Sequence, residues 1–348
     1  MRTDDEGRGG LPAAATAAPE RPARRPADGP VARVERGDLA AIELRGADVL
    51  RYLHTVTSQH LAERRPPEAA GALLLSPKGK IEFAFRVAVL PDRDGAVRVV
   101  VDTEAEAAEA LAERLARFVF RYDVRVGEPV PGGLTLLGAA SGEAAESAGL
   151  PVPADTDHAA EHRADNPDDG SADDSWLVVH RTALGLDLVG PGVAGAASAP
   201  ALLGVPAAGA GDLEALRIEA GIPRWGRELT DDVIAEEAGL LGSHVHLDKG
   251  CYPGQETVAR VHNLGQVPRR LAGLLVDGAA PPPFRADLTT GDGRRAGQAR
   301  SAAVHPALGP IALAYVRRTV APGERVHAAG AAATVVDLPF RPVPGDRS

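Results

Sequence analysis

The sequence predicts an α+β protein that ends in a small antiparallel β-barrel. Between about residues 31 and 126, hairpin-like strand pairs surround helices, without the regular strand–helix alternation of a parallel sheet. From residue 269 onward, short strands alternate with glycine and proline, which is typical of a small barrel. The 348 residues, 44% hydrophobic and 25% charged, have globular composition and suffice for two or three domains.

The N-terminal part begins with a segment that we expect to be a disordered tail. Residues 1–30 carry five prolines, five acids, five arginines and no aromatic side chain. Alternating apolar residues over 31–44 then predict one strand, and Gly46 opens a short helix. Thr103 and Glu106 predict a capping box for a helix ending near Phe120. Further strands are expected at 73–75, 81–90, 97–101 and 122–126, the first two around the turn Ser76-Pro-Lys-Gly79.

The middle of the chain contains a strongly acidic stretch. Residues 155–174 hold eight acids and one arginine, which indicates a disordered, solvated insertion rather than a metal site. A strand is expected at 176–180, and Asp212 should cap a helix over 213–220 that Gly221 stops. We therefore expect an αβ region over 31–268 and a barrel over 269–348, with barrel strands at 271–276, 297–302, 311–316, 325–328 and 334–338.

Charge and cysteine content exclude several function classes. The net charge of −10 disfavours direct nucleic-acid binding. The single cysteine, Cys251, excludes an intramolecular disulfide framework and any metal site with two thiolates from one subunit. The charge-free stretch between Asp187 and Asp212 is broken by prolines and does not predict a membrane span. No apolar stretch near the start favours a secretory signal, so we expect a cytoplasmic protein without a membrane partner.

The segment Lys249-Gly-Cys-Tyr-Pro-Gly-Gln-Glu-Thr-Val-Ala-Arg260 carries the most chemical information. It holds the only cysteine and one of three lysines, in a chain whose other 35 basic residues are arginine. A thiol beside an ammonium group has a lowered pKa if the two side chains converge. The side chains of Tyr252, Gln255, Glu256 and Arg260 could hydrogen-bond a polar heterocycle. The alternative interpretation is a turn with a buried, inert cysteine.

This segment resembles the Lys-Gly-Cys-Tyr/Phe-x-Gly-Gln-Glu signature of the folate-binding YgfZ-type proteins, which are relatives of the glycine-cleavage T-protein (aminomethyltransferase). Three other segments are similar to that family in the same order, at 42–57, 75–81 and 216–226. The resemblance covers about residues 31–345. It implies a T-protein-like folate-binding domain of mixed αβ subdomains followed by a small antiparallel β-barrel, with tetrahydrofolate, or a derivative of it, as cofactor in a central cavity.

The resemblance also implies roles and partners. The family's role is in the assembly or repair of iron–sulfur cluster enzymes, including tRNA-modifying ones, so folate and iron–sulfur client or assembly proteins are the expected partners. Cys251 matches the reactive residue, and no metal site is implied. The implied folate-binding residues are Lys249, Tyr252, Gln255, Glu256, Arg260, Arg217 and Glu219.

Departures from the aminomethyltransferase pattern favour an accessory factor over a transferase. The acidic pair that follows the glycine turn in true aminomethyltransferases is replaced by Glu82-Phe83, and their Gly-Tyr-Thr-Gly-Glu segment is absent at 181–190. Folate-dependent one-carbon (aminomethyl) transfer therefore remains the alternative, and the sequence leaves open whether the protein is an enzyme. A nucleic-acid-binding regulator is a third, disfavoured hypothesis.

One thiolate per subunit cannot hold an ordinary iron–sulfur cluster, so we expect transient use of Cys251. A second hypothesis makes His244, His246 and Cys251 metal ligands, with Asp248 or His262 as the fourth. Their spacing matches no common zinc pattern, which favours polar residues on a loop. The sequence does not identify the client proteins or the oligomeric state, nor whether folate is a reactant or an effector.

Overall fold

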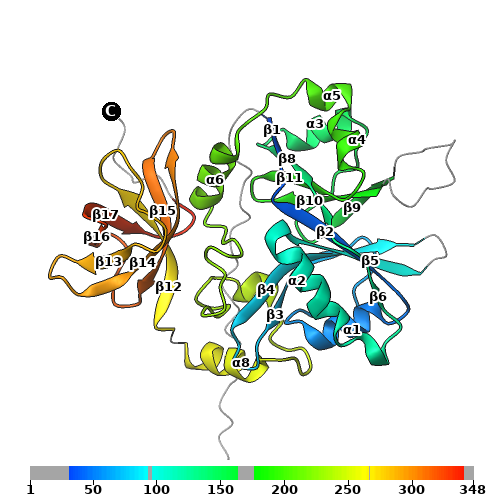
Figure 1. The fold of residues 1–348 in the computed structure, drawn as a ribbon, viewed down its shortest axis with the longest axis horizontal. Helices are drawn as coiled ribbons and strands as arrows, with labels where there is room; N and C mark the ends of the chain where they lie inside the picture. Colours follow the sequence, from blue (N-terminus) through cyan, green and yellow to red (C-terminus); the bar gives the residue numbers. More distant parts are fainter. Residues whose placement is uncertain (1–30, 93–95, 164–175, 266, 341–348) are drawn as a thin grey trace, which may run out of the picture.

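The computed structural model describes residues 31–92, 96–163, 176–265 and 267–340. Two antiparallel sheets and a closed barrel organise these residues (Figure 1). The expected tail at 1–30 lies outside the described residues. The barrel stands apart from the two sheets in Figure 1, with helix α6 between them.

The first sheet has six strands and carries two helices on one face. The path is β3-β4-β5-β2-β6, and β7 also pairs with β2. Ile42, Val87 and Val101 pack against Leu53 of α1 and Leu111 of α2. This packing follows from the alternation of apolar residues in the strands, which places one face of the sheet in the core. The elements are β2 (Leu39–Arg45), α1 (Val49–Val56), β3 (Ala69–Leu75), β4 (Ile81–Pro91), β5 (Val97–Glu104), α2 (Ala105–Ala116), a 3-10 turn η1 (Val119–Arg121), β6 (Arg125–Val126) and β7 (Val130–Pro131).

The second sheet has five strands in the order β1-β8-β11-β10-β9. It packs on the first sheet through Trp176, Val178 and Val189, which contact Leu90 and Val100 in one buried cluster. Three short helices, α3–α5, pack with Leu134, Leu186 and other residues of this sheet in a separate cluster. The elements are β1 (Ala32–Glu35), β8 (Gly133–Leu137), α3 (Ser141–Ser147), β9 (Ala159–Arg163), β10 (Trp176–Thr182), β11 (Gly185–Val189), α4 (Val193–Ala197) and α5 (Pro200–Leu203).

The structure corrects the prediction of a single strand over residues 31–44. The segment forms two strands, β1 and β2, which belong to different sheets. The turn at residues 36–38 separates them, and Gly132 N–H and Gly133 C=O bond backbone groups of Leu39 and Arg36 there. Alternation predicts extended backbone but does not specify which sheet a strand joins, so the pattern could not reveal the break.

Part of the expected acidic insertion is also ordered. Residues 159–163 form strand β9 at the edge of the second sheet, while 164–175 lie outside the described residues. Glu161 of β9 forms an ion pair with Arg98, a fully buried arginine that also pairs with Glu43. The Arg98 guanidinium lies 5.0 Å from the Trp176 ring. The acidic residue in β9 therefore neutralises a buried cation instead of facing solvent.

The predicted capping box at Thr103 is wrong. Strand β5 continues through Thr103 to Glu104, and α2 begins at Ala105. The Thr103 hydroxyl donates to the carbonyl of Ala84 at 3.0 Å, so it is used between strands and not at the helix end.

The C-terminal strands close into an antiparallel barrel, as predicted. The order is β12-β15-β14-β13-β16-β17, and small or β-branched side chains fill the interior, with Leu274 and Leu288 among the largest. Strand β13, which the sequence analysis did not predict, has only four residues. The strands are β12 (Arg269–Val276), β13 (Asp287–Thr290), β14 (Arg295–His305), β15 (Gly309–Arg317), β16 (Arg325–Ala328) and β17 (Ala331–Val336).

Three helices connect the sheets to the barrel: α6 (Ala210–Glu219), α7 (Leu241–His244) and α8 (Gln255–Leu264). Helix α6 begins three residues earlier than predicted, and the Asp212 carboxylate accepts the N–H of Gly209 at 2.9 Å from inside its first turn. Gly221, with φ +68°, follows its end. Helix α8 leads into β12 (Figure 1). No helix in the described part of the chain has both the length and the apolar composition needed to cross a membrane.

Candidate functional site

A cavity of about 640 Å³ lies between the two sheets and α6. Its volume falls in the range of small-molecule binding sites. The residues that line it come from segments far apart in the sequence. They include Arg36–Asp38 between β1 and β2, Leu39 of β2, Ala84–Arg86 of β4, Asp102–Glu104 of β5, Asp187 of β11, Leu213, Glu214 and Arg217 of α6, and Ile222–Arg224 after α6.

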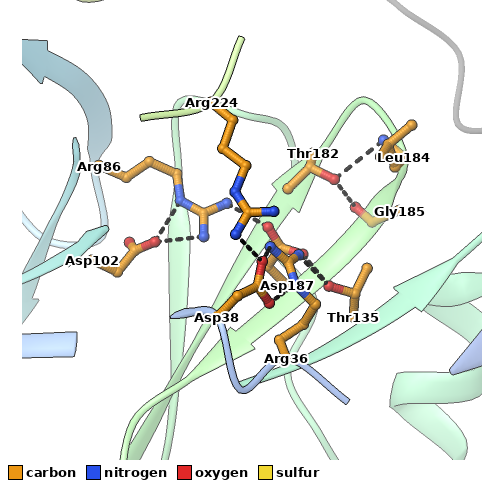
Figure 2. Close-up of polar contacts among 10 residues, drawn as sticks. All are labelled: Arg36, Asp38, Arg86, Asp102, Thr135, Thr182, Leu184, Gly185, Asp187 and Arg224. Atoms are coloured by element: carbon orange, nitrogen blue, oxygen red, sulfur yellow. Dashed lines mark hydrogen bonds and ion pairs between the residues drawn. The ribbon is translucent and has the colours of Figure 1, made fainter. Parts of the chain in front are cut away.

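Two rows of polar side chains, one from each sheet, meet at this cavity, and Arg86, Asp102 and Asp187 of these rows line it (Figure 2). Arg86 and Asp102 are cross-strand neighbours in the first sheet. Thr135, Asp187 and His180 are cross-strand neighbours in the second sheet. Because directly opposed residues of antiparallel strands share a face, each row presents its side chains to the other sheet. The sheet registers thus place these charges together.

Arg86 links the two rows. Its guanidinium donates to Asp102 Oδ2 at 2.5 and 2.7 Å and to Asp187 Oδ2 at 2.7 Å. The other oxygen of Asp187 accepts the Thr135 hydroxyl at 2.6 Å. The Arg86 guanidinium is half-buried, and its two carboxylate partners compensate it for the water that it loses.

A second set of charges lies on the turn between β1 and β2 (Figure 2). The Arg36 guanidinium donates to Asp38 at 2.8 and 3.1 Å and to the Thr135 hydroxyl at 2.9 Å. Arg224, which follows α6, approaches the Asp38 carboxylate at 3.4 Å. The network thus continues from the sheets to the segment after α6.

The pKa values of Asp102 and Asp187 lie below the ordinary value of an aspartate, so both carboxylates stay ionised at neutral pH. Burial raises the pKa of Asp102, but Arg86 and then His180 lower it more, so that it lies below its usual value. The His180 Nε2 atom is 3.0 Å from Asp102 Oδ1. Burial likewise raises the pKa of Asp187, and Arg86 and Arg36 outweigh this effect. The cavity therefore offers fixed anions and cations that can hydrogen-bond a polar ligand.

Apolar side chains form the rest of the lining. Leu39, Phe85, Leu184, Leu213 and Leu229 are all buried residues that border the cavity. A small-molecule site commonly combines such walls with a few placed polar groups. The cavity thus combines apolar walls with charged groups.

Of the eight site residues predicted from the sequence, Arg217 is the one that lines the cavity. Its guanidinium donates to Glu214 at 2.6 and 2.9 Å and to the fully buried Glu228 at 3.1 Å. Glu219, two residues later, lies toward the barrel instead. Its carboxylate is 3.4 Å from His305 Nε2.

Lys249 is held away from this cavity. Its buried ammonium group donates to the carbonyl oxygens of His54, Thr57 and Gln59, the last two at 2.6 and 3.0 Å. Burial lowers the pKa of Lys249 to about 8. The Tyr252 ring centroid lies 4.9 Å from the same nitrogen. Lys249 therefore fixes its segment to the end of α1.

The two glycine-containing motifs pack directly on each other. Gly254, with φ +81°, lies so close to the β3–β4 turn that a Cβ atom there would be 2.6 Å from the carbonyl oxygen of Ser76. Gly79 has φ +73°, and a Cβ atom there would lie 2.7 Å from the Cβ atom of Thr257 in α8. Both positions require glycine for conformation and for space. This contact explains why the motifs lack side chains at these points.

The remaining signature residues lie on the surface side of this contact. Cys251, Glu256 and Arg260 are exposed, and the Gln255 amide donates to the Lys249 carbonyl oxygen at 3.4 Å. The structure thus brings Lys249, Tyr252 and Gln255 together, but it does not bring the segment into the lining of the central cavity. Direct folate contacts by these residues stay a prediction.

Comparisons with known proteins give sequence matches to aminomethyltransferases. The chain is 38% identical over 144 residues to an aminomethyltransferase of Moorella thermoacetica, covering 39% of this chain and 38% of that protein. It is 36% identical over 147 residues to an aminomethyltransferase of Streptomyces avermitilis, covering 41% of this chain and 37% of that protein. A putative chloroplastic transferase of Arabidopsis thaliana is 36% identical over 109 residues, covering 31% of this chain and 24% of its own length. The matches therefore span about a quarter to two fifths of these relatives. No family model matches the chain.

A solved structure extends the likeness to almost the whole chain. The glycine cleavage system aminomethyltransferase T from Bartonella henselae superposes with a TM-score of 0.77, covering 91% of this chain and 87% of that one at 21% identity. The chain has the T-protein fold. The sequence matches and the solved structure both lead to aminomethyltransferases.

Within the T-protein fold, the acidic pair position supplies no carboxylate to the cavity. Glu82 forms an ion pair with Arg114 at 3.1 Å, and the Phe83 ring stacks on Trp225 with centroids 6.2 Å apart. Neither residue lines the cavity. Asp102 and Asp187 lie there instead.

The cavity residues that were not predicted from the sequence include Arg36, Asp38, Arg86, Asp102 and Asp187. A signal was present, because three of them interrupt apolar strands: Arg86 follows Phe85, Asp102 follows Val99–Val101, and Asp187 lies between two leucines. Charged residues are seldom buried unless they are paired. Such interruptions could have identified the cavity residues of this T-protein fold, but not their partners.

The histidines weighed as metal ligands are used differently. His244 lines the central cavity, whereas the His246 ring lies 5.2 Å from that of His60. Across the described ranges, no group of three or more histidine, cysteine, aspartate or glutamate side chains is arranged to hold a metal ion.

Proposed function

We propose that this chain binds tetrahydrofolate in the central cavity and acts as a YgfZ-type accessory protein for iron–sulfur enzymes. The observation that carries the folate part is the cavity of about 640 Å³, with charged and apolar walls, in a fold shared with an aminomethyltransferase. A reduced folate has a pterin with amide and amino groups, an aromatic linker and a carboxylate tail. These features suit the lining residues by chemistry.

The polar rows would recognise the pterin. The ionised carboxylates of Asp102 and Asp187 accept N–H groups, and the guanidinium of Arg86 keeps both of them charged and oriented. Phe85 and Leu213 supply apolar contact for the rings. When bound, tetrahydrofolate would either carry a one-carbon group or act as an effector of the chain.

The exposed thiol supports the accessory role. Cys251 lies outside the cavity lining, on a segment that Lys249 and the Gly79–Gly254 contact hold in place. An exposed thiol on a fixed segment is suited to meet a partner protein. Because one thiolate cannot hold a cluster alone, the proposed partners are iron–sulfur client or assembly proteins that contribute the other ligands.

Aminomethyl transfer is the second candidate. Asp102 favours it, because this residue places an ionised carboxylate in the cavity although Glu82 and Phe83 lie elsewhere. The named sequence relatives favour it as well. An assay of methylene transfer from an aminomethyl donor to tetrahydrofolate separates the two candidates.

Calorimetric titration with tetrahydrofolate, under reducing conditions, tests the folate part. We expect binding by the native chain, and at least a tenfold loss of affinity for Asp102→Asn, since a charged hydrogen-bond acceptor is worth about 1.5–3 kcal/mol. Cys251→Ser should bind folate like the native chain. Equal affinity of Asp102→Asn and the native chain, with both folded by thermal melting, would place the ligand elsewhere.

The accessory role is tested in cells that depend on this protein. Cys251→Ser should lose the ability to restore iron–sulfur enzyme activity while it keeps folate binding. Full activity of that variant would refute the role assigned to the thiol.

A further inference from the structure

Arg300, on strand β14 of the barrel, is buried without a matching anion. Its side chain is 3% exposed, and its guanidinium makes no hydrogen bond to any residue that the structure describes. The nearest carboxylate oxygen, Asp232 Oδ2, is 3.9 Å away. The Nε atom is buried without a partner. A buried guanidinium normally needs hydrogen-bonded partners to offset its loss of water.

The carboxylates near Arg300 are already engaged by another arginine. Arg269 contacts Asp232 Oδ2 at 3.0 Å and Glu237 Oε1 at 3.1 Å. The guanidinium groups of Arg269 and Arg300 lie 4.8 and 5.5 Å from the centroid of the Tyr315 ring. The local acids thus compensate Arg269 and leave Arg300 with little negative charge.

A second uncompensated arginine approaches from the β12–β13 loop. Arg285 is exposed, and no ion pair joins it to any described acid. Its backbone has φ +64°, and its N–H bonds the carbonyl of Ala299 at 3.0 Å, which fixes it beside β14. The Arg285 and Arg227 guanidinium groups lie 5.3 and 5.0 Å from the Phe284 ring centroid.

The electrostatics of Arg300 reflect this excess of positive charge. Burial lowers the pKa of Arg300, and Arg269 and Arg285 add to the decrease, while Asp232 and Tyr315 oppose it. The net direction is downward, which is unusual for an arginine in a protein. A bound anion would remove both the unpaired donors and the repulsion.

We propose that Arg300 and Arg285, flanked by Arg227, bind an oxyanion: the phosphate or carboxylate group of a ligand. The planar fork of a guanidinium matches both groups with two parallel hydrogen bonds. Phe284 presents an exposed ring beside the arginines, so the rest of the ligand has a surface to contact.

This site is separate from the central cavity. None of Arg227, Arg285 and Arg300 lines that cavity. The buried carboxylate of Glu228 lies between the two, since it accepts the Arg217 guanidinium on one side and the Ser301 N–H at 3.0 Å on the other. The inference therefore does not depend on the proposed folate site.

The experiment uses the full chain and two probes, inorganic phosphate and glutarate, each against sodium chloride at equal ionic strength. Calorimetry and thermal unfolding measure binding to the native chain, Arg300→Met and Arg295→Met. Arg295 is the matched control, because it lies on the same strand but is exposed and pairs with Asp287 at 3.4 Å. Arg285→Ala, at an exposed position, covers the case in which Arg300→Met does not fold.

We expect one or both probes to bind the native chain and Arg295→Met, and to raise their unfolding temperatures. Arg300→Met should bind the probes at least tenfold more weakly than the native chain. Arg285→Ala should bind them about fivefold more weakly. Without anion, Arg300→Met should be as stable as the native chain or more so, since an apolar side chain replaces an unpaired charge. Phosphate binding alone assigns a phosphoryl ligand, and glutarate binding alone assigns a carboxylate. Binding of neither probe, or equal binding by Arg300→Met, overturns the proposal.

Discussion

The central cavity and the segment Lys249–Arg260 are positioned by opposite means. In the cavity, charges from separate strands compensate one another, as Arg86 does between Asp102 and Asp187. In the segment, one ammonium group binds backbone carbonyl oxygens, and glycines allow close packing on the β3–β4 turn. The cavity residues are scattered along the chain, whereas the segment is continuous.

This difference explains why one region was visible in the sequence and the other was not. Glycine at 79 and 254 is required by the positive φ of the backbone there, and Lys249 lies five residues before Gly254, so these residues appear in short motifs. The cavity needs only that charges meet across sheets, which no short motif records. A prominent motif therefore need not mark the ligand cavity itself.

The largest effect should come from breaking the charge network of the cavity. Arg86→Met leaves Asp102 and Asp187 buried without their shared cation, so the free energy of unfolding should fall by about 3–5 kcal/mol. Denaturant titration measures this loss. Arg51→Met is the control, because Arg51 is 76% exposed and should change stability by less than about 0.5 kcal/mol. A similar small change for Arg86→Met would mean that the network does not hold the sheets together.

The corresponding change in the segment should be smaller. Lys249→Met removes three hydrogen bonds to backbone carbonyls, with an expected loss of about 2–3 kcal/mol in unfolding free energy. Lys78→Met, in the exposed part of the β3–β4 turn, is the matched lysine control and should be neutral. If both variants unfold like the native chain, the ammonium group is not what fixes the segment.

The loss of stability at low pH should depend on the cavity and not on the segment. The folded-state pKa values of Asp102 and Asp187 lie below their unfolded values, so their stabilising contribution is present above about pH 4 and is lost as the pH falls through the folded values. Unfolding temperatures from pH 6 to pH 3 should therefore fall more steeply for the native chain than for Asp102→Asn. Lys249→Met should keep the native slope, since Lys249 does not titrate in this range. Parallel curves for all three proteins would contradict the assignment of the acid sensitivity to the cavity.

The smallest effect is expected at Cys251. Its side chain is exposed, so Cys251→Ser should change unfolding free energy by less than about 0.5 kcal/mol. The native thiol should react with a water-soluble disulfide reagent about as fast in the folded chain as in the unfolded chain. Slow reaction of the folded chain would show that the thiol is covered.

Most elements of the fold follow from apolar periodicity and turn residues. The strands around Ser76–Gly79 and five of the six barrel strands were predicted, because alternation and glycine act over a few neighbouring residues. The division of 31–44 between two sheets was not, because strand partners are chosen by tertiary packing. Strand β9 was hidden by the acidic stretch around it, and its one acid, Glu161, is compensated by Arg98, which lies 63 positions away.

A cavity residue was predicted only where it belongs to a segment that resembles a known family. Arg217 lines the cavity and was found through its segment, while its neighbour Glu219 contacts the barrel. Asp102 and Asp187 carried a local signal, a charge within an apolar strand, but their shared cation Arg86 is specified by the packing of two sheets. Pairings of this kind cannot be read from one sequence.

The turn at residues 36–38 forms part of the cavity wall and also joins β1 of one sheet to β2 of the other. A molecule that fastens Arg36 and Asp38 therefore restrains the ends of two strands in separate sheets. Amide protons in β1 and β2 should then become protected from exchange in concert, so that occupancy of the cavity is reported in both sheets.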